Sequence, residues 1–166
     1  RPGRAEQAAR QLKAVGTAGT PLPDQRTFHQ HLHSQTATRD TLSVDPGDVD
    51  AKLKEATRVV RATYMHPYHM HASIATACAV ADVKADGATV WSSTQAVYPL
   101  KNTMATMLGL KPESVRIVFR MGPGCYGVNG ADTVSYDAAL LSQAVGRPVR
   151  VQLSRQDEMA WENYGP

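Results

Sequence analysis

The sequence predicts an α+β fold, a mixed sheet with packed helices, and three observations support this prediction. Strand-like apolar runs alternate with helical patterns in the second half of the chain. Asp86-Gly87 separates the apolar runs Ile74–Lys84 and Ala88–Ser92, and Asp-Gly in such a place is a strong hairpin signal. A glycine-rich turn, Gly122–Gly130, connects a strand-like run to a helical one.

The first 55 residues are polar and weakly patterned. We expect them to be a lead-in segment, either a linker or the tail of a preceding domain. The elements expected here are a helix at 4–13, a loop at 17–24, a short helix at 24–34 with Asp24 as its N-cap, a turn at 45–48 and a helix from there to about Glu55.

From residue 57 onward the patterns are stronger. The expected strands are 57–65, 74–84, 88–92, 115–120 and 149–154, and the expected helices are 98–108, 132–145 and 156–162. Gly109 is expected to end the first of these helices. The second is expected to bury a stripe of Val134, Ala138, Leu141 and Val145.

Composition bounds the function classes. The 166 residues are 42% hydrophobic and 20% charged, which is typical of one ordinary globular domain. The net charge of +3 comes without basic runs, so we expect no nucleic-acid surface. No run approaches the roughly 18 apolar residues of a membrane span. Cys78 and Cys125 lie far apart, and their spacing does not require a disulfide.

The ends of the chain suggest an excerpt from a longer polypeptide. There is no initiator Met, and the sequence stops abruptly at Pro166. Localisation therefore stays open between bacterial cytoplasm and periplasm.

The turn Gly122–Gly130 is the strongest candidate binding feature. Glycines lack a Cβ, so backbone N–H groups can point at an oxyanion, and the helix that follows adds further unpaired donors. A phosphate or a metal-oxo group is the natural guest. The alternative is a bulged turn whose glycines only permit positive φ. Residues 122–127 also fit a dinucleotide-binding pattern, but Pro123 removes a donor and Asp157 follows by about 30 residues instead of about 20.

Other candidate groups carry weaker signals. Two histidine clusters could supply imidazoles to a zinc ion, although alternating His in a polar segment is more typical of a solvated face. The clusters are His29, His31 and His33, and His66, His69 and His71. Cys125 lies near helix N–H groups but has no evident partner base. Gln95 lies where a strand gives way to a helix, and its amide can both donate and accept.

The order of several motifs resembles the large subunit of the xanthine dehydrogenase and aldehyde oxidase family. The branch it resembles most contains isoquinoline 1-oxidoreductase and nicotinate dehydrogenase. The motifs are Ala62–Ser73, Val90-Trp91-Ser92-Ser93-Thr94-Gln95, Met121-Gly122-Pro123-Gly124-Cys125-Tyr126-Gly127, Gly146–Val151 and Arg155-Gln156-Asp157-Glu158. The resemblance is clear over about residues 56–166, which it identifies as the N-terminal part of a molybdenum-cofactor-binding domain.

The resemblance implies a molybdenum-dependent oxidoreductase with a molybdenum–pterin cofactor, in bacteria often the cytosine dinucleotide form. Such enzymes hydroxylate a carbon of an N-heteroaromatic or aldehyde substrate with water as the oxygen source. Electrons then pass to [2Fe-2S] clusters on an iron–sulfur small subunit, and a cytochrome c is one candidate acceptor. The remainder of the large subunit is the other implied partner.

The resemblance also implies which residues bind the cofactor. Gln95 occupies the place of the glutamine that hydrogen-bonds the molybdenum-bound oxo group and the pterin. The glycine-rich part of the cofactor wall corresponds to Gly122, Gly124, Cys125, Tyr126 and Gly127. Many relatives carry Gly-Gly-Gly-Phe-Gly there, so Pro123, Cys125 and Tyr126 depart from the pattern.

No catalytic residue and no direct metal ligand is expected in these 166 residues. Molybdenum is held through the pterin, and the family's general-base glutamate lies near the far end of the large subunit. We assign that role to neither Glu158 nor Glu162, and we expect the chain alone to be inactive. Two alternatives remain, a non-catalytic scaffold or assembly module related to the family and a zinc-dependent hydrolase using the His clusters.

Overall fold

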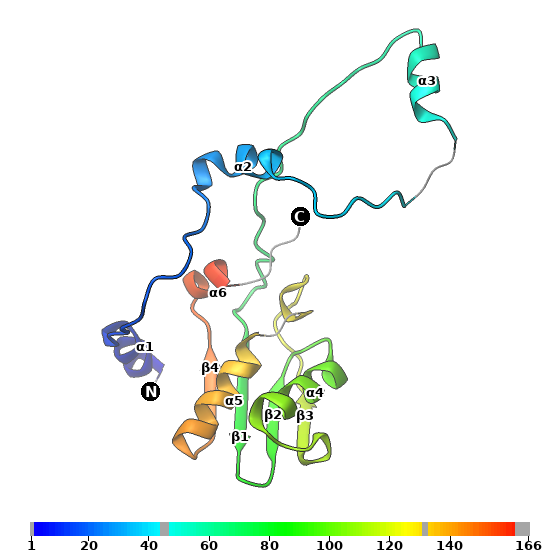
Figure 1. Cartoon of the computed structure of the whole chain (residues 1–166). Helices are drawn as coiled ribbons and strands as arrows, with labels where there is room; N and C mark the ends of the chain where they lie inside the picture. Colours follow the sequence, from blue (N-terminus) through cyan, green and yellow to red (C-terminus); the bar gives the residue numbers. More distant parts are fainter. Residues whose placement is uncertain (1, 44–46, 131–132, 162–166) are drawn as a thin grey trace. The chain divides into compact units, whose positions relative to one another are not determined.

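The computed structural model describes residues 2–43, 47–130 and 133–161 (Figure 1). It divides into two compact units, Arg1–Met65 and His66–Pro166. Each unit is described separately below.

The first unit consists of short helices joined by irregular segments. They are α1 (Pro2–Gln11), the 3₁₀ helix η1 (Gln25–Thr27), α2 (Phe28–Ser34) and α3 (Val49–Glu55). Asp24 accepts a hydrogen bond from the Arg26 backbone N at 2.9 Å, which is N-cap geometry. The Arg26 guanidinium also lowers the pKa of the Asp24 carboxyl below its usual value. The three helices expected from the sequence here are confirmed, whereas the expected turn at 45–48 lies partly outside the described residues.

The strand expected at 57–65 is wrong. No residue of this range is in a strand, and its side chains are exposed, Val60 by 77% and Tyr64 by 91%. The β-branched and aromatic residues that predicted a strand favour one only where a neighbouring strand is present to pair with. None of the described strands pairs with this segment.

The second unit contains a mixed four-stranded sheet, which confirms the predicted fold class. Its strands are β1 (Cys78–Val83), β2 (Ala88–Ser92), β3 (Val115–Phe119) and β4 (Val149–Gln152), in the order β3-β2-β1-β4. β1 pairs antiparallel with both β2 and β4, and β2 pairs parallel with β3. The predicted hairpin is present, with the Lys84 backbone N donating to Gly87 O at 2.8 Å across the turn.

Helices α4 (Val97–Leu108) and α5 (Thr133–Val145) lie over the same face of the sheet (Figure 1). Strand residues alternate buried and half-buried, so one face of the sheet supplies the core. Met104 of α4 and Val90 of β2 are completely buried in it. Gly109 ends α4 in the left-handed conformation, with a φ of 69°, as expected. Three shorter helices follow in chain order, the 3₁₀ helices η2 (Pro112–Ser114) and η3 (Val128–Gly130) and the α-helix α6 (Arg155–Trp161).

The buried stripe of α5 differs from the predicted one. Leu141 and Val145 are 49% and 57% exposed, whereas Ala138, Ala139 and Ser142 are completely buried. The reason is the surface that α5 covers, since β1 presents mainly alanine and valine there and small helix residues allow a close approach. The position Asp132, expected to begin this helix, lies outside the described residues.

Candidate functional site

The topology of the sheet brings four separate segments to one edge. β2 and β3 are parallel, so Gln95 after β2 and Gly122–Gly130 after β3 follow strand ends on the same side. β1 begins at this edge and β4 ends there, as the pairing of Cys78 with Gln152 shows. The segment before β1 and helix α6 after β4 therefore lie at this edge as well.

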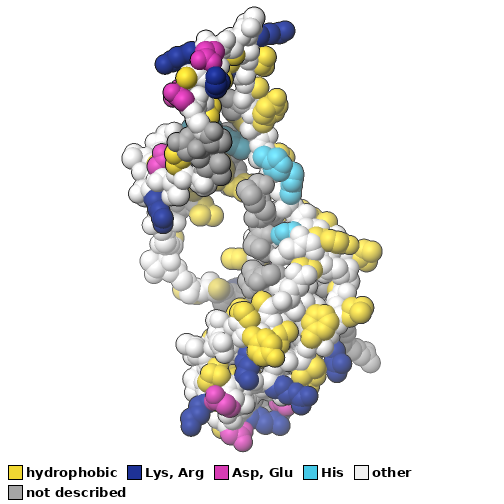
Figure 2. All heavy atoms as spheres, turned by 90° about the vertical axis from the view of Figure 1, so that its right-hand side faces the viewer, with side chains coloured by type: hydrophobic (Ala, Val, Ile, Leu, Met, Phe, Trp, Pro, Cys, Tyr) yellow, Lys and Arg dark blue, Asp and Glu magenta, His cyan; other side chains and the backbone are white. Residues whose placement is uncertain are grey.

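The opposite end of this unit has a different character. Figure 2 shows Lys, Arg, Asp and Glu side chains gathered there, around the β1–β2 hairpin. Asp82, Lys84, Asp86 and Arg116 line a shallow pocket at that end. The sequence-predicted binding residues all lie at the other edge.

Residues 127–129 of the glycine-rich loop wrap around Cys125. Its Sγ accepts hydrogen bonds from the backbone N atoms of Gly127 and Asn129, both at 3.3 Å. Its carbonyl accepts from the Val128 N at 3.1 Å. Three of the N–H groups that the sequence analysis expected to bind an anion therefore donate to Cys125 instead.

The backbone donors of residues 124–126 are not used in this way. Among the described residues, the backbone N–H groups of Gly124, Cys125 and Tyr126 have no hydrogen-bond acceptor. The φ angles of Gly124 and Tyr126 are 127° and 54°, which gives this stretch an unusual, turned backbone. Successive N–H groups in such a turn suit an anionic or strongly polar guest. The residues present thus fit a polar cofactor on this side of the loop.

Two of the loop glycines are explained by contacts with protein. A Cβ on Gly127 would lie 2.4 Å from His71 Nε2, and a Cβ on Gly122 would lie 2.7 Å from Ser93 Cβ. The loop therefore packs closely against the segment before β1 and against the turn after β2. The sequence predicted that these glycines leave room for a ligand. At Gly122 and Gly127 the space is instead filled by the side chains of Ser93 and His71.

Gln95 lies on a turn that buried hydroxyl groups stabilise. Thr94 is 1% exposed, its N donates to Ser92 Oγ at 3.0 Å, and its own Oγ1 accepts from Ala96 N at 3.1 Å. The Gln95 side chain is exposed, and its backbone N donates to Asn129 O at 3.4 Å. The structure thus brings Gln95 next to the glycine-rich loop, 27 or more positions later in the chain.

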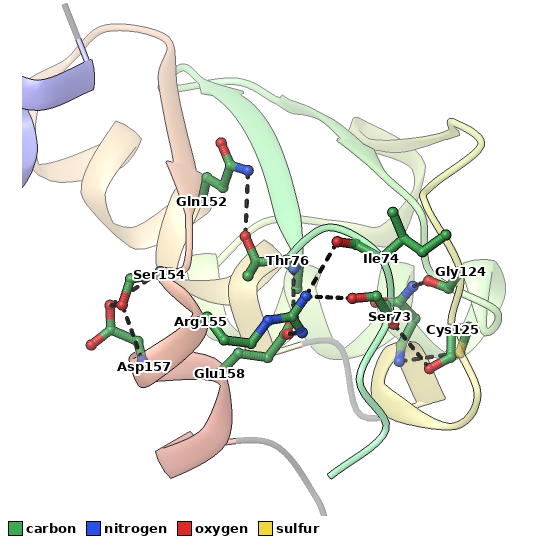
Figure 3. Close-up of polar contacts among 12 residues, drawn as sticks. Ser73, Ile74, Thr76, Gly124, Cys125, Gln152, Ser154, Arg155, Asp157 and Glu158 are labelled. Atoms are coloured by element: carbon green, nitrogen blue, oxygen red, sulfur yellow. Dashed lines mark hydrogen bonds and ion pairs between the residues drawn. The ribbon is translucent and has the colours of Figure 1, made fainter.

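Helix α6 contributes a polar network that the sequence did not predict (Figure 3). Glu158 is 1% exposed, and its two carboxylate oxygens accept from Ala77 N at 2.7 Å and from Arg155 Nη1 at 2.6 Å. Arg155 Nη2 donates to the carbonyls of Ser73 and Ile74. The only sequence signal for this network was the Arg-x-x-Glu spacing after a strand, which places the two side chains on one helix face. With both oxygens engaged, Glu158 is poorly suited to act as a base.

The other candidate groups do not assemble into a site. The rings of His66 and His69 are in contact, with centroids 4.2 Å apart. Yet the described residues contain no group of three or more His, Cys, Asp or Glu that could hold a metal ion. Cys78 and Cys125 are free thiols. No helix within the described ranges is long and apolar enough to cross a membrane.

Known proteins share both the sequence pattern and the fold. The molybdopterin cofactor-binding domain family matches residues 28–165. A subunit of nicotinate dehydrogenase from Pseudomonas putida is 39% identical over 166 residues, which cover 98% of this chain and 14% of that protein. Xanthine dehydrogenase/oxidase of Rattus norvegicus is 28% identical over 158 residues, which cover 93% of this chain and 12% of that protein.

A solved structure, quinoline 2-oxidoreductase from Pseudomonas putida 86, has the same fold. It matches with a TM-score of 0.72 at 18% identity, over 99% of this chain and 22% of that one. The chain therefore spans only a minor part of the relatives it matches. The resemblance seen in the sequence motifs is confirmed, and the chain belongs to the molybdopterin cofactor-binding domain family, within the group of xanthine dehydrogenases and aldehyde oxidases.

Proposed function

We propose that this sheet edge forms one wall of a molybdenum–pterin site in an enzyme that hydroxylates an N-heteroaromatic or aldehyde substrate, with water as the oxygen source. The observation that carries the proposal is the contact between Gln95 and the glycine-rich loop, made through Asn129 O at 3.4 Å. This contact holds the Gln95 backbone against the loop, at the edge where two parallel strands end, and this supports a role for the exposed Gln95 side-chain amide in the same site. The family match supplies the identity of the guest.

Each cofactor-binding residue has a role that its geometry supports. The exposed Gln95 amide donates to and accepts from polar atoms of the cofactor. The N–H groups of Gly124, Cys125 and Tyr126 donate to its anionic or carbonyl groups. Gly122 and Gly127 keep the loop close to its neighbours. The cofactor, possessing the redox-active metal, supplies the oxidation chemistry, while this wall supplies orientation and electrostatics.

The substrate class is inferred from the name of the nicotinate dehydrogenase relative, since nicotinate is an N-heteroaromatic compound, and from the aldehyde oxidases in the group to which the chain belongs. No residue of this chain is assigned to abstract a proton, because Glu158 is buried and each of its carboxylate oxygens already accepts a hydrogen bond. The general base is expected from another part of a longer subunit.

The partners follow from the same proposal. Two relatives are named as subunits, one of nicotinate dehydrogenase and the other of a probable xanthine dehydrogenase from Bacillus subtilis. We expect an iron–sulfur small subunit carrying [2Fe-2S] clusters, a cytochrome c as one electron acceptor and the cytosine dinucleotide form of the pterin. The zinc-dependent alternative has no assembled ligand group among the described residues.

The test is the cofactor content of the full-length protein. We expect about one molybdenum and one pterin per polypeptide in the wild type. Gln95→Ala should lower the affinity for the cofactor by roughly 10- to 100-fold, the usual effect of losing an outer-shell partner. Gln7→Ala, which changes an exposed glutamine in α1, is the matched control. Zinc in place of molybdenum, or equal molybdenum in Gln95→Ala and wild type, would contradict the proposal. A protein with molybdenum but no hydroxylation of any N-heteroaromatic or aldehyde substrate would favour the scaffold alternative.

A further inference from the structure

We infer that Arg155 and Glu158 are positioning residues for the glycine-rich loop. They fix the segment that precedes β1, and that segment in turn fixes the loop. The inference rests on the proposed function in one respect, since it takes the loop to hold the cofactor.

The first step is the burial of Glu158, whose partner Arg155 stays partly exposed. The Glu158 side chain is 1% exposed and that of Arg155 is 38% exposed, with Arg155 Nη1 and Glu158 Oε2 2.6 Å apart. Buried ion pairs contribute little to stability compared with well-packed apolar residues of similar volume. A role in fixing a specific geometry explains this pair better than stability alone does.

The second step is the set of backbone groups that the pair contacts (Figure 3). Arg155 Nη2 donates to the carbonyls of Ser73 and Ile74, while Glu158 Oε1 accepts from Ala77 N at 2.7 Å. The planar guanidinium holds these bonds in fixed directions. The segment 73–77 therefore has one register against α6. The sequence predicted that this strand begins at Ile74, but β1 begins at Cys78. The α6 side chains explain the difference, because they bond backbone groups of residues 73–77.

The third step leads from the segment to the loop. Ser73 is 2% exposed, and its Oγ donates to Cys125 O at 3.4 Å. Two residues earlier, the His71 imidazole occupies the space beside Gly127. Ala72 between them has a φ of 53°, so the backbone there is held in an unusual conformation. A shift of this segment would move Cys125 and Gly127, which flank the N–H donor of Tyr126.

Arg155→Lys in the full-length holoprotein separates positioning from general stability. Lysine keeps a positive charge for Glu158 but cannot hold the carboxylate and both carbonyls in one planar fork. We expect the hydrogen-bonded amides of Gly127, Val128 and Asn129 to exchange with solvent about tenfold faster, while amides in β2 and α4 keep wild-type rates. Cofactor release should accelerate by roughly 10-fold or more. Arg150→Lys is the matched control, since Arg150 is exposed and, within the described part of the chain, its Nη2 bonds only Gln152 Oε1, at 2.6 Å.

Glu158→Gln, which is nearly isosteric, replaces Arg155→Lys if the lysine variant does not fold. Wild-type exchange in the loop together with wild-type cofactor release would overturn the inference. So would uniform loss of protection across the whole sheet, or failure of both variants to fold, because the pair would then have a general structural role. Failure of the proposed function gives a different result, a wild-type protein without molybdenum. The loop amides would still report on the positioning in that case.

Discussion

Gly127 is subject to two constraints, one from its backbone conformation and one from its contact with His71. Its φ is 124°, a region that L side chains rarely adopt, and the space for a Cβ is occupied by His71. Both the backbone conformation and the contact with the neighbouring segment thus require glycine.

Gly127→Ala should therefore destabilise the protein and reduce cofactor retention. The backbone conformation alone costs about 1–3 kcal/mol, and displacement of His71 adds to it. Gly109→Ala is the comparison, because Gly109 also has a positive φ, 69°, but no atom within 4 Å of its would-be Cβ. Thermal unfolding should give a larger fall in Tm for Gly127→Ala than for Gly109→Ala. Equal falls would show that the contact with His71 does not constrain the loop.

At this scale the sequence predicted which residues come together better than it predicted the contacts that hold them. Gln95 and the loop glycines were identified by type and spacing, and the structure brings them together. Burial of Glu158 could not be predicted, because its partner Ala77 lies 81 positions away. The use of the Cys125 sulfur as an acceptor likewise depends on how the loop folds back on itself.

Among the elements, α5 is tied to the sheet through the buried hydroxyl of Ser142. Ser142 is completely buried, accepts from the Val83 N at 3.0 Å and donates to Arg147 O at 2.8 Å. It connects the end of β1, the end of α5 and the turn that leads into β4.

Ser142→Ala should cost about 1–3 kcal/mol, because it leaves the Val83 N–H buried without an acceptor. Thr103→Ala removes a hydroxyl from an exposed position of α4, where it bonds the Pro99 carbonyl of the same helix, and should change stability by less than about 0.5 kcal/mol. Urea unfolding of both variants measures the difference. A Ser142→Ala variant as stable as Thr103→Ala would show that the hydrogen bonds of Ser142 do not stabilise the packing of α5 on the sheet.

Elements with local signals were predicted well, and elements that depend on distant partners were not. The Asp86-Gly87 hairpin and the end of α4 at Gly109 follow from turn and cap chemistry. The expected strand at 57–65 lacks a pairing strand among the described residues. The buried face of α5 was set by the alanines of β1, which periodicity within α5 does not reveal.

Across the whole chain, burial is distributed unevenly. Every residue whose burial is described and that is buried lies in the second unit, whereas the described residues of the first unit form no buried core. The second unit should therefore resist local opening far better than the first.

Limited trypsin digestion of the 166-residue chain tests this difference. Early cuts are expected after Arg58 and Arg61, which lie in an exposed segment without secondary structure. Lys101, within α4, should be cut much later. Early cleavage at Lys101 would contradict the stability order inferred from burial.

The position of molybdenum tests the central claim most directly. A crystal structure of the full-length protein with anomalous data at the molybdenum edge would locate the metal and its pterin. The cofactor is expected at the sheet edge, with its polar atoms about 2.7–3.2 Å from the Gln95 amide or from the N–H groups of Gly124–Tyr126. A molybdenum peak beside the β1–β2 hairpin, or a bound cofactor that contacts none of these groups, would contradict the account.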